Sequence, residues 1–360
     1  MKKFFALFIV LILVLATLGC TDNSQVVSDD KEGDKVTDKK PEDDNDKPDK
    51  TDDTKPKIDF DEVQPNEAGE IMVLMYHSIA PEEDTWVRTP DNFRKDLEKL
   101  YKNGYRLVSM RDVIKGNIDI EAGKSPVVLT FDDGTQGHFN YIEKDGDLVI
   151  DPDSAVGILL EMNEKYPDFG TAATFYINSN PFRQPEYAER KLKELVEFGM
   201  DIGHHTYGHI YLDQHGPEEI QRQMAKLQEL VNDVLPDYPL DTFALPFGIW
   251  PQDEYRQYAI AGEYDGINYE NIGVLEVGSY PAVSPFNKSF DPMSIPRVRA
   301  SYEEGYGHFK FFFDVFEDNP SRRYVSDGDP NYVTVPEELK DKINLDDFPY
   351  KELRTYTIDE

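Results

Sequence analysis

The chain has 360 residues, enough for one large domain or two small ones, and a formal net charge of −33 at pH 7. So acidic a chain offers no basic face for phosphates, which argues against nucleic acid as a partner. Cys20 is the only cysteine. Disulfides, a cysteine nucleophile and a thiolate metal site are therefore excluded from the rest of the chain, and its stability must come from a packed core.

Residues 1–20 have the layout of a signal peptide. Two lysines precede an apolar run from Phe4 to Leu15, which is shorter than the roughly 20 residues that a transmembrane helix needs. Thr17-Leu18-Gly19 before Cys20 resembles the lipobox of bacterial lipoproteins, although Thr17 stands where leucine is usual. We expect a lipid on Cys20 that anchors the protein at the extracellular face of a bacterial cell membrane. An ordinary cleaved signal peptide, and hence secretion, or a short membrane anchor is the alternative.

Residues 21–66 have the composition of a tether. Asp, Lys, Pro, Asn and Thr dominate, and apolar residues are almost absent between Val36 and Ile58. Such a segment buries too little surface to offset the entropy of ordering it, which predicts disorder. Binding of calcium or a wall polymer by the acidic run is the alternative reading.

From residue 67 onward, short apolar runs alternate with amphipathic helical patterns. The predicted strands cover 71–76, 106–108, 127–131, 173–177, 200–203 and 243–245. One predicted helix begins at Thr89-Pro90 and closes at Gly104, and others cover about 156–166, 186–198 and 217–234. Residues 141–153 have the pattern of an inserted hairpin. Alternation of this kind favours an α/β fold with a parallel sheet, either open or closed into a barrel.

Residues that suggest chemistry follow four of the predicted strands. These clusters are His77, Asp132-Asp133, His204-His205 and Pro246-Phe247. In α/β barrels the residues after the strand ends form the rim of the active site. The pattern therefore predicts that these residues meet at one edge of the sheet.

The clusters contain a candidate metal site. His205 and His209 are four residues apart, so on a helical turn both imidazoles could reach one ion, although a surface or capping role is the alternative. Adjacent carboxylates at a strand end point in different directions, so one of Asp132 and Asp133 could bind metal while the other faces a substrate. A solvated Asp-Gly turn is the simpler explanation of that pair.

Thr130-Phe131-Asp132-Asp133-Gly134 together with His205-Thr206-Tyr207-Gly208-His209 resembles the first two motifs of the polysaccharide deacetylases (carbohydrate esterase family 4, the NodB-homology domain). The resemblance spans roughly Ile71 to Arg299. It implies a distorted (β/α) barrel and one divalent metal held by Asp133, His205 and His209, with Asp132 as the general base. Zinc is the default ion for such ligands, with cobalt, nickel and manganese as alternatives.

The third family motif is altered. Ala244-Leu245-Pro246-Phe247-Gly248 stands where the family has Arg-Pro-Pro-Tyr, and the late Leu-x-His motif is missing. The chain is more similar to a circularly permuted branch, the poly-N-acetylglucosamine deacetylases, through Met75-Tyr76-His77 and Pro296-Arg297. That resemblance implies that His77 is the general acid. It also implies that Phe247 offers its backbone N–H to the oxyanion.

Two further assignments follow from the same resemblance. Arg297, or alternatively Arg299, would supply the positive charge that the altered third motif no longer places beside Asp132. His204 and His138 are not expected to be metal ligands, and Trp86 and Trp250 could stack on sugar rings or simply pack.

The implied chemistry is hydrolysis of an acetamide. Metal-bound water is the nucleophile, Asp132 takes its proton, and His77 protonates the leaving amine. We expect residues 67–300 to form the catalytic domain, acting as a monomer on acetyl groups, most of all N-acetyl groups, of a cell-wall or extracellular polysaccharide. The role of residues 301–360 is not assigned. A catalytically impaired glycan-binding module at the cell surface and a metal-dependent hydrolase of another substrate are the competing hypotheses.

Overall fold

The structure is a computed structural model that describes residues 58–301 and 303–357. The predicted signal peptide, Cys20 and most of the predicted tether lie outside these residues. A nine-stranded sheet forms the centre, in the order β13-β10-β9-β8-β5-β1-β14, with β4 also paired to β5 and β15 to β1. Its strands are β1 (Glu70–Tyr76), β4 (Tyr105–Leu107), β5 (Ser125–Phe131), β8 (Thr174–Ile177), β9 (Asp201–His204), β10 (Thr242–Ala244), β13 (Gly273–Leu275), β14 (Ala282–Val283) and β15 (Val298–Arg299).

The main sheet is parallel except at β14, which pairs with β1 antiparallel. The sheet also curls, because Leu275 of β13 bridges Ile295 while β15, a few residues later, pairs with β1. The segment from Ile295 to Arg299 thus links the two ends of the parallel row. This architecture confirms the predicted α/β fold of the distorted (β/α) barrel type.

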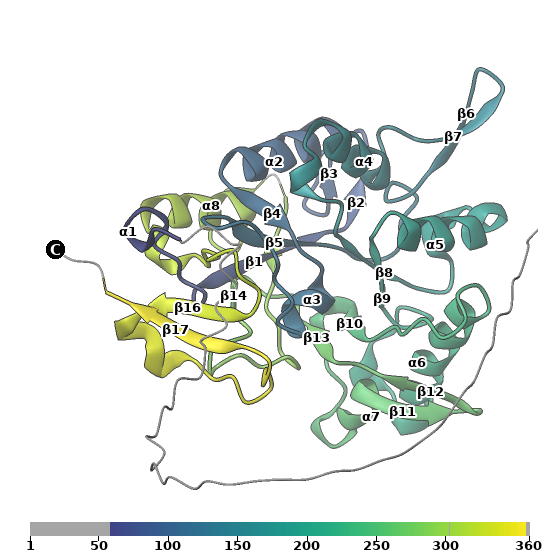
Figure 1. The fold of residues 1–360 in the computed structure, drawn as a ribbon. Helices are drawn as coiled ribbons and strands as arrows, with labels where there is room; N and C mark the ends of the chain where they lie inside the picture. The colour runs from purple at the N-terminus through teal and green to yellow at the C-terminus, as the bar shows by residue number, and fades with distance from the viewer. Residues whose placement is uncertain (1–57, 302, 358–360) are drawn as a thin grey trace, which may run out of the picture. The chain divides into compact units, whose positions relative to one another are not determined.

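Helices lie along the outside of the sheet (Figure 1). Their bounds are α1 (Phe60–Val63), α2 (Pro90–Lys102), α3 (Met110–Ile114), α4 (Ala155–Lys165), α5 (Ala188–Glu197), α6 (Pro217–Asn232), α7 (Gln257–Ile260) and α8 (Phe309–Asp318). The small two-stranded sheets are β2 (Ser78–Ile79) with β3 (Val87–Arg88), β6 (Tyr141–Lys144) with β7 (Asp147–Ile150), β11 (Ala261–Tyr264) with β12 (Ile267–Glu270), and β16 (Tyr332–Pro336) with β17 (Glu352–Tyr356).

Helix α2 shows how the sequence fixes these elements. The Thr89 hydroxyl accepts the Asn92 N–H at 3.4 Å, and proline occupies the first turn, where its missing N–H has no cost. Phe93, Leu97 and Leu100 recur at helical spacing and are fully buried. Each buries enough apolar surface to contribute about 2 kcal/mol, as an upper estimate. The predicted hairpin over residues 141–153 is confirmed by the antiparallel β6–β7 pair, which projects from the body in Figure 1.

The C-terminal segment completes the core at the start of β1. Glu67, just before β1, is buried, and its carboxyl accepts hydrogen bonds from the Thr334 N–H at 2.8 Å and the Tyr324 hydroxyl at 3.0 Å. Burial, with a smaller contribution from nearby Asp327, raises the pKa of Glu67 to about 8. Residues far apart in sequence thereby share one buried polar cluster.

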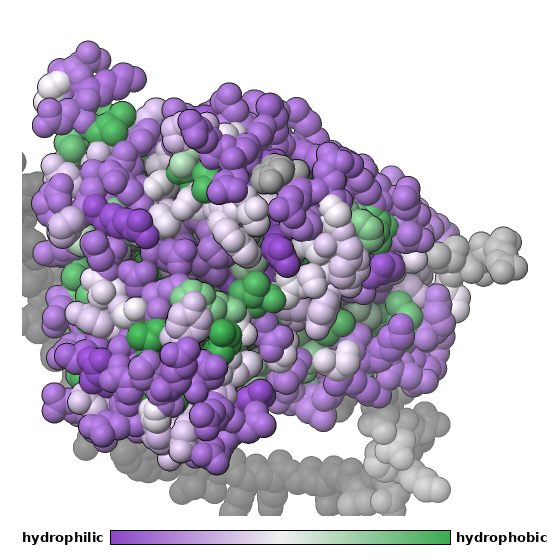
Figure 2. All heavy atoms as spheres, turned by 180° about the vertical axis from the view of Figure 1, so that it is seen from behind, coloured by the Kyte–Doolittle hydropathy of each residue, from purple (hydrophilic) through white to green (hydrophobic). Residues whose placement is uncertain are grey.

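Two surface properties bear on function. Among residues 58–301 and 303–357, no helix is both long and apolar enough to span a bilayer. The face seen in Figure 2 is mainly hydrophilic, with hydrophobic residues confined to small patches. This agrees with the strongly negative composition.

Candidate active site

The reactive side chains follow the carboxyl ends of neighbouring parallel strands. His77 follows β1 and Asp132 follows β5, and the two strands are in register at their ends because Tyr76 pairs with Phe131. The Asp132 N–H donates to the Tyr76 carbonyl at 3.0 Å, which extends the pairing one residue beyond the strands. His205 directly follows β9 on the same edge. The structure thus brings together the clusters that the sequence placed after separate strands.

Asp133, His205 and His209 converge, as predicted for the metal ligands. One Asp133 carboxylate oxygen lies 3.1 Å from Nε2 of His209 and 3.4 Å from Nε2 of His205, and the three ligand atoms lie within 4.8 Å of one another. His205 Nδ1 lies 2.7 Å from the Ala244 carbonyl and must donate to it, which leaves Nε2, the nitrogen nearer Asp133, as the one that can bind a metal. Burial opposes ionisation of Asp133, but the two histidines outweigh it and lower the pKa of its carboxyl. One carboxylate and two imidazole nitrogens fit a divalent transition metal.

The predicted helical turn between the two histidines is wrong. The segment after β9 is a bend rather than a helix, with Thr206 at φ 58° and His209 at φ 50°. His204 fixes this bend, because its Nδ1 accepts the Thr206 N–H at 3.0 Å and its Nε2 lies 2.9 Å from the Met224 carbonyl. Burial lowers the pKa of His204 to about 4, so the ring is neutral and structural. Spacing alone could not distinguish this bend from a helical turn.

Left-handed backbone is concentrated around the site. Asp133 (φ 78°), Thr206 (φ 58°), His209 (φ 50°) and Phe247 (φ 58°) all adopt positive φ without being glycine. Each such residue costs on the order of 1–3 kcal/mol, and residues of this kind cluster at functional sites where the surrounding fold holds them in place. This backbone strain therefore lies at residues in and around the candidate metal site.

Asp132 is paired with a buried arginine. Arg297 is fully buried and donates from its two terminal nitrogens to the two Asp132 oxygens, each at 2.7 Å. It also donates to the Thr130 hydroxyl at 3.1 Å and the Glu276 carbonyl at 2.9 Å. Burial raises the pKa of Asp132, but the Arg297 charge and hydrogen bonds overcome this and lower it below its ordinary value. Of the two predicted arginines, Arg297 contacts Asp132.

Arg299 takes a different position. Its guanidinium lies 5.7 Å from the centre of the Trp86 ring, and Trp86 in turn packs on the His77 imidazole with ring centres 4.5 Å apart. His77 Nδ1 is buried with no hydrogen-bond partner among the described residues. Burial lowers the pKa of His77, against the opposing charges of Asp132 and Asp133. Packing against Trp86, rather than a carboxylate partner, therefore orients the predicted general acid.

His138 is not part of the ligand set. Its Nδ1 accepts the Thr135 N–H at 3.2 Å, so its Nε2 carries the proton and contacts the His77 carbonyl. Burial lowers the pKa of His138 to about 3. This neutral histidine holds the backbone of His77 in place.

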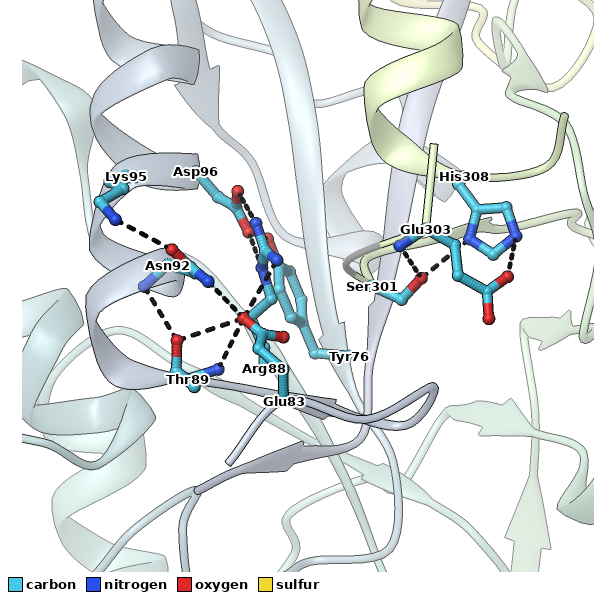
Figure 3. Close-up of polar contacts among 10 residues, drawn as sticks. All are labelled: Tyr76, Glu83, Arg88, Thr89, Asn92, Lys95, Asp96, Ser301, Glu303 and His308. Atoms are coloured by element: carbon cyan, nitrogen blue, oxygen red, sulfur yellow. Dashed lines mark hydrogen bonds and ion pairs between the residues drawn. The ribbon is translucent and has the colours of Figure 1, made fainter. Parts of the chain in front are cut away.

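Two polar clusters brace the loop that carries Trp86 (Figure 3). In the first, one Glu83 oxygen accepts from the Asn92 amide at 2.5 Å, the Thr89 hydroxyl at 3.2 Å and Arg88 at 3.2 Å. Arg88 also donates to both oxygens of the buried Asp96, at 2.7 and 2.8 Å. These bonds tie the loop to the first turns of α2.

The second cluster ties the same loop to the segment before α8. Thr85 donates to Glu303 at 3.3 Å, and Glu303 pairs with Nε2 of His308 at 3.0 Å. The other ring nitrogen of His308 lies 2.8 Å from the Ser301 hydroxyl. Neither cluster was foreseen, because each joins residues whose only sequence signal is ordinary polarity.

The Phe247 ring reaches the metal-ligand set from the β10 side. It meets His209 edge-on at 4.5 Å between ring centres and stacks on Tyr211 at 3.9 Å. Sequence reasoning considered Phe247 only for its backbone N–H and missed Tyr211. Trp250 donates to Glu276 at 3.3 Å and lies under Arg256, which indicates packing at the edge of the site.

Comparisons with known proteins found similar sequences and structures. A family model described as polysaccharide deacetylase matches residues 119–265. This range contains the candidate metal ligands, Asp132 and Phe247, but not His77 or Arg297. YxkH of Bacillus subtilis (strain 168), a candidate polysaccharide deacetylase, is 25% identical over 210 residues, which cover 58% of this chain and 67% of YxkH.

Solved structures of deacetylases are also similar. The Streptococcus pyogenes deacetylase PplD, in complex with acetate, has a TM-score of 0.48 at 23% identity, with 64% of this chain and 92% of PplD covered. A de-N-acetylase from Aggregatibacter actinomycetemcomitans has a TM-score of 0.47 at 16% identity, with 68% and 99% covered. Residues 119–265 therefore form a domain that matches the polysaccharide deacetylase family model.

Proposed function

We propose that this protein is a metal-dependent deacetylase that removes acetyl groups, most of all N-acetyl groups, from N-acetylglucosamine-type units of a cell-wall or extracellular polysaccharide. The family supports the reaction and the substrate class. The observation that carries the proposal is the buried Asp132–Arg297 pair, which holds a carboxylate ionised beside the candidate metal ligands. A module that only binds glycans has no use for such a base.

Asp133, His205 and His209 are the residues that would hold the metal. Their donor atoms fit zinc, with cobalt, nickel and manganese as alternatives. A divalent ion bound there supplies a Lewis acid, which polarises the acetyl carbonyl and lowers the pKa of a water molecule.

The protein's own groups perform the proton transfers. Asp132 accepts a proton from the water that adds to the acetyl carbon, and Arg297 keeps it ionised and correctly aimed. The Phe247 N–H would donate to the developing oxyanion. As the carbon–nitrogen bond breaks, His77 donates a proton to the departing amine, so acetate and a free amino sugar leave.

The proposal is tested by measuring acetate release. The substrates are acetylated chito-oligosaccharides, poly-N-acetylglucosamine, peptidoglycan and acetylxylan, each with metal-loaded wild type and with Asp132→Asn. We expect release from an N-acetylated glycan by the wild type and a loss of about 10²- to 10⁴-fold in Asp132→Asn. No release from any substrate, together with retained glycan binding, would favour a non-catalytic surface module.

We also propose that the protein is a lipoprotein at the extracellular face of the membrane. The support is the apolar leader and the cysteine at position 20. Labelled palmitate should enter the wild type and not Cys20→Ser, and the variant should appear in the medium. Labelling of Cys20→Ser equal to the wild type would contradict the assignment.

A further inference from the structure

Two exposed aromatic rings form a flat stack beside the site. Tyr211 and Phe247 are 43% and 45% exposed, their ring centres are 3.9 Å apart, and their planes differ by 1°. Each ring covers one face of the other, so their exposure lies on the outer faces and edges. Two stacked rings present a flat apolar surface that the apolar face of a ligand could cover.

The local chain fixes the stack in place. Tyr211 follows directly on the loop that carries His209, and the next residue, Leu212, is fully buried and anchors that loop in the core. Phe247 lies in the short turn after β10 and presents its ring to His209 at 4.5 Å. The stack therefore starts at a candidate metal ligand, and Tyr211 lies one ring further out.

A third exposed aromatic ring lies on the opposite side of the reactive groups. Trp86 is 43% exposed and packs on His77. His77 follows β1, whereas His209 and Phe247 follow β9 and β10, and the strand order places β5 and β8 between them. Asp132 and Asp133, which follow β5, are thus flanked by an aromatic surface on each side.

The roles of the groups assign these two surfaces to different sugar units. His77 must reach the nitrogen of the reacting unit, which places that sugar ring on the Trp86 side. The Tyr211–Phe247 stack lies on the other side of the ligand set, beyond His209. One ring cannot occupy both places, whereas a neighbouring unit of the same glycan chain could cover the stack with its apolar C–H face.

We propose that the Tyr211–Phe247 stack binds a second sugar unit next to the one that is deacetylated, so that the substrate is an amino-sugar chain rather than a free monosaccharide. This inference rests on the proposed function for the class of its ligand. Tyr211 is then a substrate-binding residue, and it selects for chain length without touching the reacting atoms.

The test uses two substitutions at one position and a matched control. Tyr211→Ala removes the stacking surface, and Tyr211→Phe keeps it. Tyr280→Ala is the control: Tyr280 is similarly exposed, at 50%, but lies near Glu70 at the far end of β1 from His77. The substrates are N-acetylglucosamine, its β-1,4-linked hexamer, and p-nitrophenyl acetate, which has an acetyl ester but no sugar.

We expect wild type to deacetylate the hexamer with a higher kcat/KM than the monosaccharide. Tyr211→Ala should lower kcat/KM for the hexamer about 3- to 10-fold, the size expected for loss of an aromatic stacking contact. The kcat/KM of Tyr211→Ala for p-nitrophenyl acetate should stay within about 2-fold of the wild-type value. Tyr211→Phe and Tyr280→Ala should match the wild type on all three substrates.

Two kinetic results would overturn the inference. An equal loss on p-nitrophenyl acetate and on the hexamer would mean that the stack only supports His209, and an unchanged hexamer reaction would mean that no sugar occupies it. Hexamer binding to Asp132→Asn, with and without Tyr211→Ala, tests the stack separately from turnover. A Kd raised about 3- to 10-fold by Tyr211→Ala supports the inference even if the wild type releases no acetate. An unchanged Kd, or no binding, refutes it.

Discussion

Replacing Arg297 with methionine would leave the Asp132 carboxylate buried without its partner. The two side chains are 0% and 2% exposed and share two hydrogen bonds of 2.7 Å. Removing one partner of a buried ion pair typically costs about 3–5 kcal/mol, because the remaining charge stays desolvated. We expect Arg297→Met to lose about that much unfolding free energy, measured by urea denaturation, and to remain folded at low temperature.

The same change should also impair Asp132 in its proposed role as the general base. Without Arg297, burial loses its main opposition and raises the pKa of Asp132, so the carboxyl is protonated over more of the acidic range. We expect kcat to fall by about 10²- to 10⁴-fold, and the acidic limb of the kcat/KM profile to move to higher pH. Acetate release across a pH series measures both effects.

Arg111→Met provides the control for a purely structural loss. Arg111 pairs with Asp201 at 2.6 Å and Asp241 at 2.8 Å, and Asp201 begins β9, at the opposite end of that strand from the site. This variant should lose stability yet keep the turnover of each folded molecule. The reasoning is refuted if the unfolding free energy of Arg297→Met lies within about 1 kcal/mol of the wild-type value. It is also refuted if the losses in the double variant with Asp132→Asn are strictly additive.

Three further predictions concern other groups. His77→Ala should abolish acetate release while bound metal stays near one ion per chain by mass spectrometry; full activity would exclude His77 as the acid. His209→Ala should lower bound metal to a small fraction of wild type at equal folded content, and unchanged stoichiometry would contradict the ligand assignment. Wild-type unfolding free energy should fall by at most about 1.4 kcal/mol per pH unit between the ordinary pKa of 4.5 and about 8, because folded Glu67 keeps a proton that the unfolded chain releases. Glu67→Gln should flatten this slope in urea titrations at several pH values, and an unaltered slope would mean that other groups cause it.

The sequence was sufficient where a residue's position after a strand determined its surroundings. Asp132 and Asp133 follow a wholly buried strand, and they contact different partners, as predicted: Arg297 for the first and the histidines for the second. The His205–His209 pair was found by spacing, but its backbone was not. A five-residue segment carries no signal that separates a helical turn from a bend held by a buried ring such as His204.

What the sequence could not provide were contacts between distant segments. Trp86 on His77 and Tyr211 on Phe247 are ring pairs set by how loops return over the rim, and neither pair shows a periodic pattern. Alternation along a strand could not separate Arg297 from Arg299, because residues two apart share a face, and the structure was needed to show that Arg297, just before β15, is the fully buried one. Tertiary packing determined these features.

The Glu67 cluster has a consequence for how the chain acquires its shape. The Asn66 and Glu67 backbone groups bond to Val325 and Thr334, so the first strand's surroundings are complete only when nearly the whole sequence is present. At about 5–20 residues per second, a ribosome would need on the order of tens of seconds to supply those late residues. During that time the nascent polypeptide lacks the contacts between its first strand and these late residues. A chain that passes through an export channel must likewise stay unfolded until it has crossed. Truncation near the carboxyl end should therefore affect acquisition of the whole fold rather than trim an appendage.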